Sequence, residues 1–287
     1  MIRNSRKSSP KAFSLIELSV VILIISILIT GILSVSVSGV QNAKTKVTRD
    51  RMDQIYIALA NYVAVNKTFP CPAAINKSKG AANYGDAATN GPTCSTYGGV
   101  TSSGDLVYGM VPVNDLGLSE EMAEDGFGSK FGYVVDDRLT VASTFDNGFT
   151  SSDADGYQPI TVTQKPANTT ISADFLIISH GANRYGSYPA NSTSTISTTG
   201  ADADELVNDQ SGYTASFTSI STSSDIFDDI IKIGVLTNLI SEFQLYSVIQ
   251  CKYSGYTDWD YKGVSACASS QTRICHAFGQ STVQSAC

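Results

Sequence analysis

The architecture of this chain follows from Lys11-Ala12-Phe13-Ser14-Leu15-Ile16-Glu17-Leu18, where a basic leader runs into an apolar segment. No charged residue occurs between Leu18 and Val40, so the segment is long enough to span a hydrocarbon core of about 30 Å. Glu17 places one carboxylate at its edge. A carboxylate inside lipid costs roughly 2.5 to 3.5 kcal/mol on insertion scales, so we expect Glu17 to be paired and functional.

The nearest basic residue before Glu17 is Lys11, and none lies within a helical turn after it. Cleavage between Ala12 and Phe13 would create a new α-amino group, with an ordinary pKa near 7.7 to 8.0, which is largely charged at neutral pH. Glu17 could pair with that amine on a neighbouring copy of the chain.

This pattern resembles the class III signal of type IV prepilins and type II secretion pseudopilins: a basic leader, a small residue, Phe-Ser-Leu-Ile-Glu and about 20 apolar residues. In that family a prepilin peptidase cuts on the cytoplasmic side and methylates the new N-terminal Phe. The resemblance therefore implies cleavage between Ala12 and Phe13, N-methylation of Phe13, and a role in assembly for Glu17.

Two positions depart from the family pattern. Ala12 stands where the family usually has Gly before the cut. Ser34 stands where major pilins commonly carry a helix-kinking Pro, with Gly31 and Gly39 nearby. The missing Pro favours a minor component.

Two other interpretations of the N-terminus compete. A secretory signal peptide has an apolar core of about 7 to 15 residues, which is shorter than this one, although Ser36-Val37-Ser38 resembles its cleavage site. An uncleaved signal anchor fits the length and the basic leader, which by the positive-inside rule stays in the cytoplasm. It leaves Glu17 unexplained.

Composition agrees with an exported body. Removing residues 1–12 takes away four basic residues and no acid, which lowers the formal charge from −7 to −11. We therefore expect no nucleic-acid partner.

The chain has an even number of cysteines: Cys71, Cys94, Cys251, Cys267, Cys275 and Cys287. Outside the cytoplasm such cysteines form disulfides. Six cysteines allow 15 pairings, and the sequence does not choose among them. Our hypothesis is one early bridge, Cys71–Cys94, and two bridges among the C-terminal four.

The predicted fold class is α+β and pilin-like, with a long N-terminal helix packed on an antiparallel sheet and a disulfide-stapled C-terminal region. We divide the chain into a removed cytoplasmic leader (1–12), a transmembrane and filament-core helix (13–40), an amphipathic helix (41–65) and a periplasmic head (66–287). The amphipathic helix has an apolar stripe, formed by Val47, Met52, Ile55, Leu59, Tyr62 and Val63. The two closely spaced prolines in Phe69-Pro70-Cys71-Pro72 should end it.

Within the head, four apolar runs bounded by turn residues predict strands. They cover 109–113, 131–135, 160–162 and 175–179. Residues 191–224, rich in Ser and Thr, predict a long loop. The apolar pattern of 225–243 fits a helical stripe better than strands.

No catalytic constellation is expected, and hence no enzyme activity; Ser179 and His180 are adjacent, which favours a turn at a strand end. Calcium is the candidate cofactor. The major pseudopilin of type II secretion carries a calcium loop after a Gly-Ala-Asp-like segment, and Gly181-Ala182-Asn183 with Asp225, Asp228 and Asp229 resembles it. Oxygen-rich loops suit this cation. A solvated acidic turn that caps the segment after it is the favoured interpretation of these residues.

The predicted function is structural: a minor pilin or pseudopilin of a type IV pilus or type II secretion filament. The implied partners are prepilin peptidase, other pilins or pseudopilins, an inner-membrane assembly platform and membrane lipid. The implied location is the bacterial inner membrane, with the N-terminus cytoplasmic and the head periplasmic, and then the filament. The alternative is a filament-tip adhesin or substrate-binding module on the same scaffold. A patch formed by Tyr253, Tyr256, Trp259 and Tyr261 would favour it.

Overall fold

The computed structural model describes residues 14–66, 68–88, 94, 101–103, 106–141, 160–209, 215–220, 227–235, 239, 249–251, 260–262 and 276–277. The chain divides into two compact units, Met1–Ala43 and Lys44–Cys287. The second unit contains the described sheets and is called the head below.

The first element, α1, is one helix over Leu15–Asn66. It ends three residues before Phe69-Pro70-Cys71-Pro72, as the prolines predict. Among the described residues, no helix carries an apolar stretch long enough to cross a membrane. The transmembrane assignment of residues 13–40 stays a prediction.

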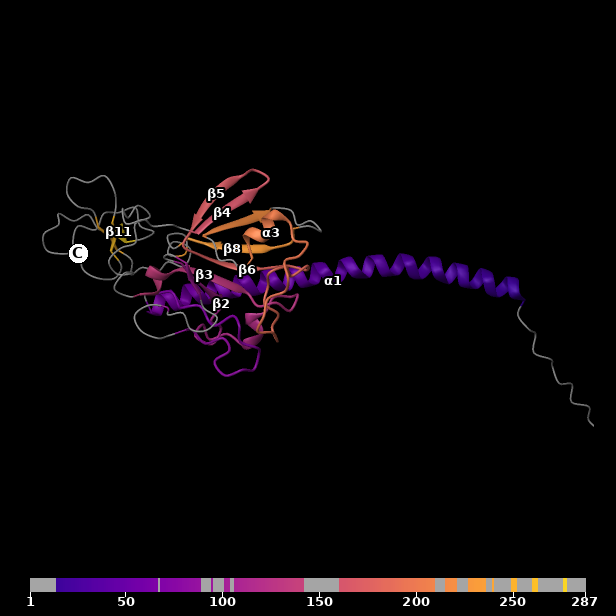
Figure 1. Cartoon of the computed structure of the whole chain (residues 1–287), viewed down its shortest axis with the longest axis horizontal. Coiled ribbons are helices and arrows are strands. Elements are labelled where there is room, and N and C mark those ends of the chain that lie inside the picture. The colour runs from indigo at the N-terminus through magenta and orange to yellow at the C-terminus, as the bar shows by residue number, and fades with distance from the viewer. Residues whose placement is uncertain are drawn as a thin grey trace, which may run out of the picture. The chain divides into compact units, whose positions relative to one another are not determined.

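The head is built around a five-stranded antiparallel sheet (Figure 1). Its strands, in spatial order, are β1 (Thr101–Ser103), β2 (Leu106–Met110), β3 (Gly132–Asp136), β6 (Phe175–Ser179) and β8 (Ile230–Gly234). Every described residue of β2, β3 and β6 is buried, so both faces of this sheet are covered.

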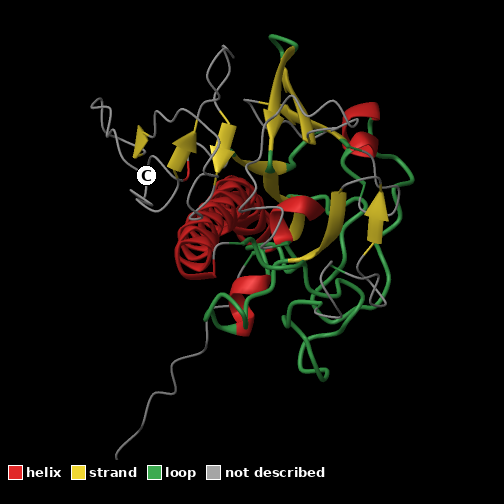
Figure 2. Cartoon of the chain, turned by 90° about the vertical axis from the view of Figure 1, so that its left-hand side faces the viewer, coloured by secondary structure: helices red, strands yellow, loops and turns green. Residues whose placement is uncertain are grey.

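A second sheet has the order β5 (Thr169–Ala173), β4 (Ile160–Lys165) and β7 (Ser216–Ile220). Its β4–β7 pair is parallel, which departs from the purely antiparallel head that the sequence predicts. A third sheet pairs β10 (Asp260–Lys262), β9 (Ile249–Cys251) and β11 (His276–Ala277). Short helical turns, red among the green loops of Figure 2, are η1 (Glu120–Ala123), η2 (Asp137–Thr140) and α3 (Ala203–Val207).

Alternation along the strands produces two cores. One core joins one face of the five-stranded sheet to the apolar side of α1; it includes Met52, Ile55, Leu59, Tyr133 and Phe175. The other core joins the opposite face to the second sheet; it includes Tyr108, Val134, Ile160, Ile178 and Phe217. Because side chains point to opposite faces with a period of two, neighbours such as Tyr133 and Val134 belong to different cores. The head is therefore three-layered.

A close backbone contact fixes the helix against the loop after η1. Thr48 is fully buried, and its hydroxyl accepts a hydrogen bond from the backbone N–H of Gly126 (2.9 Å). Arg51 Nη1 donates to the carbonyl of Glu124 (2.7 Å). A Cβ at Gly126 would collide with the carbonyl of Lys44, so only glycine permits this approach.

Most predicted elements are confirmed, with shifted ends. The predicted strands at 131–135, 160–162 and 175–179 correspond to β3, β4 and β6. The strand predicted at 109–113 begins three residues later than β2 and overlaps only its last two residues. Two predictions are wrong. Residues 191–224 contain α3 and β7, and the helix expected within 225–243 is strand β8 over its described core. In the apolar stripe of α1, Val47 is 41% exposed.

Lys130 is a fully buried cation between two segments of the head. Its Nζ donates to the carbonyls of Ile75 and Ser192, both at 2.8 Å, and lies over the rings of Tyr84 and Tyr188. Burial lowers the pKa of Lys130 to about 8, although Glu124 opposes the shift.

We predict that Lys130 makes the free energy of unfolding of the head increase with pH between pH 8 and 10. Its pKa in the unfolded chain is near 10.4, so between pH 8 and 10 the unfolded state binds more protons than the folded state. The free energy of unfolding should therefore rise by about 1.4 kcal/mol per pH unit relative to Lys130→Met. Urea unfolding at pH 7, 8, 9 and 10 measures this difference. Lys46→Met, at an exposed position of α1, is the control, and parallel pH profiles for wild type and Lys130→Met would contradict the prediction.

Candidate functional site

Glu17 lies in the first turn of α1, on an exposed surface, and helps to cap the helix. The backbone N–H of Ser14 donates to Glu17 Oε2 (3.2 Å), and the Ser14 hydroxyl accepts from the N–H of Ile16 (3.3 Å). Ser at the cap with Glu three residues later is the capping-box pattern. Ala12 and Phe13, between which cleavage is predicted, lie outside the described residues.

The first turns of α1 expose large apolar side chains on both sides of Glu17. Those with large exposed fractions are Leu15, Ile16, Leu18, Val20, Val21, Ile22, Leu23, Ile24, Ile25 and Ile27. Consecutive positions point in all directions around a helix, so this surface is not a stripe that one flat partner could cover. A helix that is apolar all round is normally buried, which makes this segment an interaction surface.

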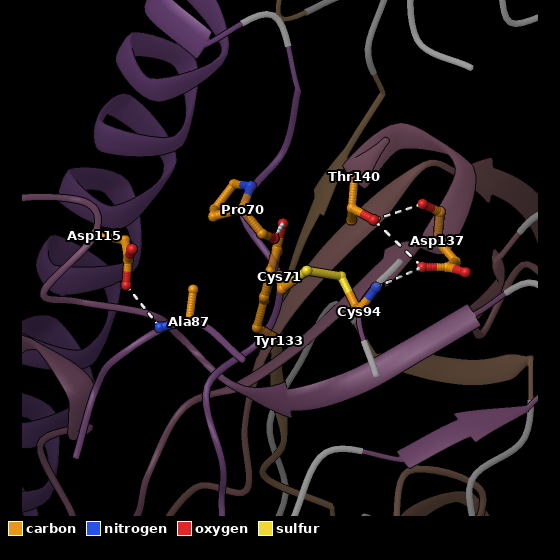
Figure 3. Close-up of a disulfide and its surroundings, with 8 residues drawn as sticks. All are labelled: Pro70, Cys71, Ala87, Cys94, Asp115, Tyr133, Asp137 and Thr140. Carbon is orange, nitrogen blue, oxygen red and sulfur yellow. Dashed lines mark hydrogen bonds between the residues drawn. A yellow bond between two sulfur atoms is a disulfide. The ribbon is translucent and has the colours of Figure 1, made fainter. Parts of the chain in front are cut away.

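The predicted Cys71–Cys94 disulfide is present and joins the segment after α1 to the neighbourhood of η2 (Figure 3). The backbone N–H of Cys94 donates to Asp137 (3.4 Å), whose carboxylate also accepts from Thr140 (3.3 Å). Nearby, Tyr133 donates its hydroxyl hydrogen to the carbonyl of Pro70 (3.3 Å). Cys251 belongs to β9, and Cys267, Cys275 and Cys287 lie outside the described residues.

The structure brings together part of the predicted calcium segment. Ala182 and Asn183 donate their backbone N–H groups to Asp228 Oδ2, at 2.6 and 2.8 Å. Gly181 has a φ of +56°, and a Cβ there would collide with the backbone carbonyl of Asp228, so the contact requires glycine. Asp225 lies outside the described residues.

A third acid in this neighbourhood was missed from the sequence. Glu205 of α3 accepts a hydrogen bond from the Asn183 amide, and carboxylate oxygens of Glu205, Asp228 and Asp229 all lie within 4.8 Å of one another. The helix α3 lies against β7, and Asp229 immediately precedes the first residue of β8. The missed signal is the spacing of Asp202 and Glu205, which form a capping box at the start of α3.

Burial and mutual repulsion govern the charge of these acids. Burial raises the pKa of Glu205; hydrogen bonding from Asn183 opposes the shift, and Asp229 adds to it. Burial likewise raises the pKa of Asp228, with backbone hydrogen bonds from Asn183 and Ala182 opposing it. Both shifts favour the protonated, neutral form of Glu205 and Asp228.

Ser179 and His180 do not form a nucleophile and base pair. The Ser179 hydroxyl donates to Asp125 Oδ2 (2.7 Å), whereas His180 Nδ1 faces Asp229 Oδ1 at 3.5 Å. Burial disfavours the charged imidazole, but Asp229, Asp125 and Asp209 outweigh it and raise the pKa of His180.

The aromatic patch predicted for an adhesin falls mostly on undescribed positions. Tyr253, Tyr256 and Trp259 lie outside the described residues, and Tyr261 belongs to β10.

Comparison with known proteins bears on the N-terminus alone. Residues 7–33 match the prokaryotic N-terminal methylation motif. The chain thus carries the class III signal peptide of type IV pilins and pseudopilins. No curated protein and no solved structure matches it.

Proposed function

We propose that this protein is a minor structural subunit of a type IV pilus or type II secretion filament, matured by prepilin peptidase and assembled through its N-terminal helix. The observation that carries the proposal is the methylation motif at residues 7–33, together with the exposed apolar surface that follows Glu17. The signal accounts for processing, and the surface accounts for assembly.

The apolar surface alone leaves the axial register of the assembled helices undefined, because apolar contact is non-directional. In the membrane these side chains are already surrounded by lipid tails, so helix association there depends on van der Waals packing and on polar contacts rather than on transfer from water. Glu17 supplies the register, because it is stabilised only where a cation meets it. The α-amino group of Phe13 on a neighbouring subunit is that cation.

Before assembly the subunit is held in the bacterial inner membrane with its basic leader in the cytoplasm and its head in the periplasm. The Cys71–Cys94 disulfide supports this placement, because structural disulfides persist in oxidising compartments. Other pilins or pseudopilins and an inner-membrane assembly platform are its partners. The absence of a kinking Pro at Ser34 favours a priming or tip position over the shaft.

The proposal is tested by mass spectrometry of the full chain expressed with and without a prepilin peptidase. We expect an N-terminal peptide that begins at N-methylated Phe13 and appears only with the peptidase. Replacing Phe13 itself would confuse methylation with cleavage, so Ala12→Glu is the better inhibitory variant: it should block the cut and leave Met1 in place. An unprocessed N-terminus in both hosts, or a cut near Ser38, would contradict the proposal.

A further inference from the structure

The three described sheets end in six edge strands, which differ in how well they are protected against further pairing. An edge strand presents unpaired backbone N–H and C=O groups, and proteins protect such edges by making them short, by placing charges on them or by covering them. The edge strands β1, β10 and β11 are only three, three and two residues long. The edge strands β5, β7 and β8 each have five residues, so length does not protect them.

Side chains protect the edges of β7 and β8. The amide of Asn208 donates to the backbone carbonyl of Thr218 and accepts from its N–H, both at 2.9 Å, so it takes the place that a neighbouring strand would occupy beside β7. Lys232 lies at the centre of β8, where its Nζ pairs with Asp53 of α1 (2.9 Å) and lies over the ring of Tyr56. A lysine in the middle of an edge strand disfavours the addition of another strand.

The strand β5 has none of these protections. Its sequence is Thr169-Thr170-Ile171-Ser172-Ala173, which contains no charged residue and no proline. Three of these residues, Thr169, Thr170 and Ser172, are exposed, and Ile171 is partly exposed. Among the described strands β5 pairs only with β4, and it forms one end of its sheet (Figure 1). An uncharged edge of this kind is a template for another strand.

The residues of β5 suit pairing with the same strand of a second copy. In an antiparallel pair centred on Ile171, the two Ile171 residues lie opposite each other, and Thr170 of each copy lies opposite Ser172 of the other. Paired hydroxyl side chains are favourable across strands, whereas like charges directly opposite each other are destabilising. The chain without its leader has a formal charge of −11, so two copies repel each other in general. Along β5 they can meet without opposing like charges.

Ile171 gives the pairing an apolar component. It lies opposite Val162 of β4, which is fully buried in the core between the two larger sheets. Residues opposite each other on antiparallel strands point to the same face, so Ile171 lies at the rim of that core. Pairing through β5 places Ile171 beside its own copy, which covers the exposed part of both side chains and continues the core across the contact.

We propose that β5 is a self-association edge, through which two copies of this chain pair antiparallel along Thr169–Ala173 with Ile171 at the twofold axis. The contact joins two three-stranded sheets into one six-stranded sheet. Because the contact is isologous, it closes at two copies. A seam of five residues is smaller than a stable interface of about 1,200 Å² or more, so it acts between copies that are already concentrated in one place. This inference does not depend on the proposed function.

Disulfide trapping in the full chain, solubilised in detergent, tests the proposal. Thr170→Cys and Ser172→Cys, purified separately and then mixed, should form a covalent dimer on oxidation with copper phenanthroline, because opposite residues in an antiparallel pair have Cα atoms about 4.5 to 5.5 Å apart. Each variant alone should form roughly tenfold less dimer, because its two copies lie on a diagonal of about 7 to 8 Å, which a disulfide does not bridge. The oxidised wild type measures the background from the native cysteines.

A charge at the centre of β5 provides the second test. Ile171→Lys, added to both cysteine variants, should reduce the dimer to the wild-type background by placing two lysines opposite each other. The matched control is Gln54→Lys, which adds the same charge at an exposed position of α1, in a different layer of the head. It should leave the dimer unchanged.

Three results would overturn the proposal. The mixture could give no more dimer than the wild type, the single cysteine variants could dimerise as well as the mixture, or Ile171→Lys could dimerise as fully as Gln54→Lys. Circular dichroism checks that Ile171→Lys is folded; if it is not, the comparison of the mixture with the single variants decides alone.

Discussion

Glu17→Ala should remove the protein from filaments while leaving its head folded. In the assembled state the substitution leaves the Phe13 amine of a neighbour without a counter-charge, and breaking a buried ion pair in this way typically costs 3 to 5 kcal/mol. Repeated at each helix contact, a loss of this size should reduce incorporation at least tenfold. Filaments sheared from cells and analysed by immunoblotting, beside the membrane fraction, measure the loss.

Because Glu17 also caps the helix, Glu17→Gln is the variant that separates the effect of its charge from the effect of capping. A Gln side chain can still accept the hydrogen bond from the N–H of Ser14 but carries no charge. We expect Glu17→Gln to be as defective as Glu17→Ala, and Ser14→Ala, which keeps the charge and loses the hydroxyl cap, to assemble. Normal assembly of Glu17→Gln would contradict charge neutralisation and leave helix capping as the role of Glu17.

Removing the Cys71–Cys94 bridge should destabilise the head by about 3 kcal/mol, because the bridge closes a loop with a sequence separation of 23 residues and restricts the unfolded chain. The variant to use is Cys71→Ser with Cys94→Ser, which leaves no unpaired thiol at the site. Urea unfolding followed by near-UV circular dichroism should show a lower midpoint with an intact native spectrum.

Reduction provides the control for this second prediction. In excess dithiothreitol the wild type loses its own bridge, so the difference in midpoint between wild type and double variant should vanish. A double variant that unfolds at the wild-type midpoint under oxidising conditions would show that the bridge contributes nothing to stability.

The sequence predicts the helix because it depends on local signals, whereas the Cys71–Cys94 pairing was one hypothesis among 15 and is established by the structure. Residues 41–65 lack Gly and Pro and have a repeating apolar stripe, and the prolines at Pro70 and Pro72 end it. The strand β8 was mistaken for a helix because its residues, Ile230 to Gly234, occupy an edge of the sheet and are only partly buried, so no clean alternation marks them. A short apolar run of this kind fits the periodicity of a helix and that of a strand equally well.

Tertiary contacts account for the remaining differences between the sequence-based predictions and the structure. Val47 fits the apolar stripe, yet the loop at Gly126 approaches the helix at the next residue, so Thr48 is buried in its place. Glu205 lies near Asp228 only because the segment between β6 and β8 crosses to β7 and returns, and no repeating sequence pattern records that path. Of the candidate acids, the sequence therefore identified the two that lie next to a strand and missed the one on a separate helix.

The pairing of Ser179 with Ile230 also has a consequence for how this chain can vary. The ends of the segment between β6 and β8 are fixed beside each other by strand hydrogen bonds. A change in length at an exposed turn of this segment, away from α3 and β7, therefore acts through the entropy of closing a loop. That entropy grows slowly, by about 0.6 kcal/mol for each doubling of loop length. Exchange of residues 197–200, which lie beyond the Ser192 carbonyl that binds Lys130, should thus be tolerated while the sheet and helix stay unchanged. The subunit can acquire new surface at this point without a new fold.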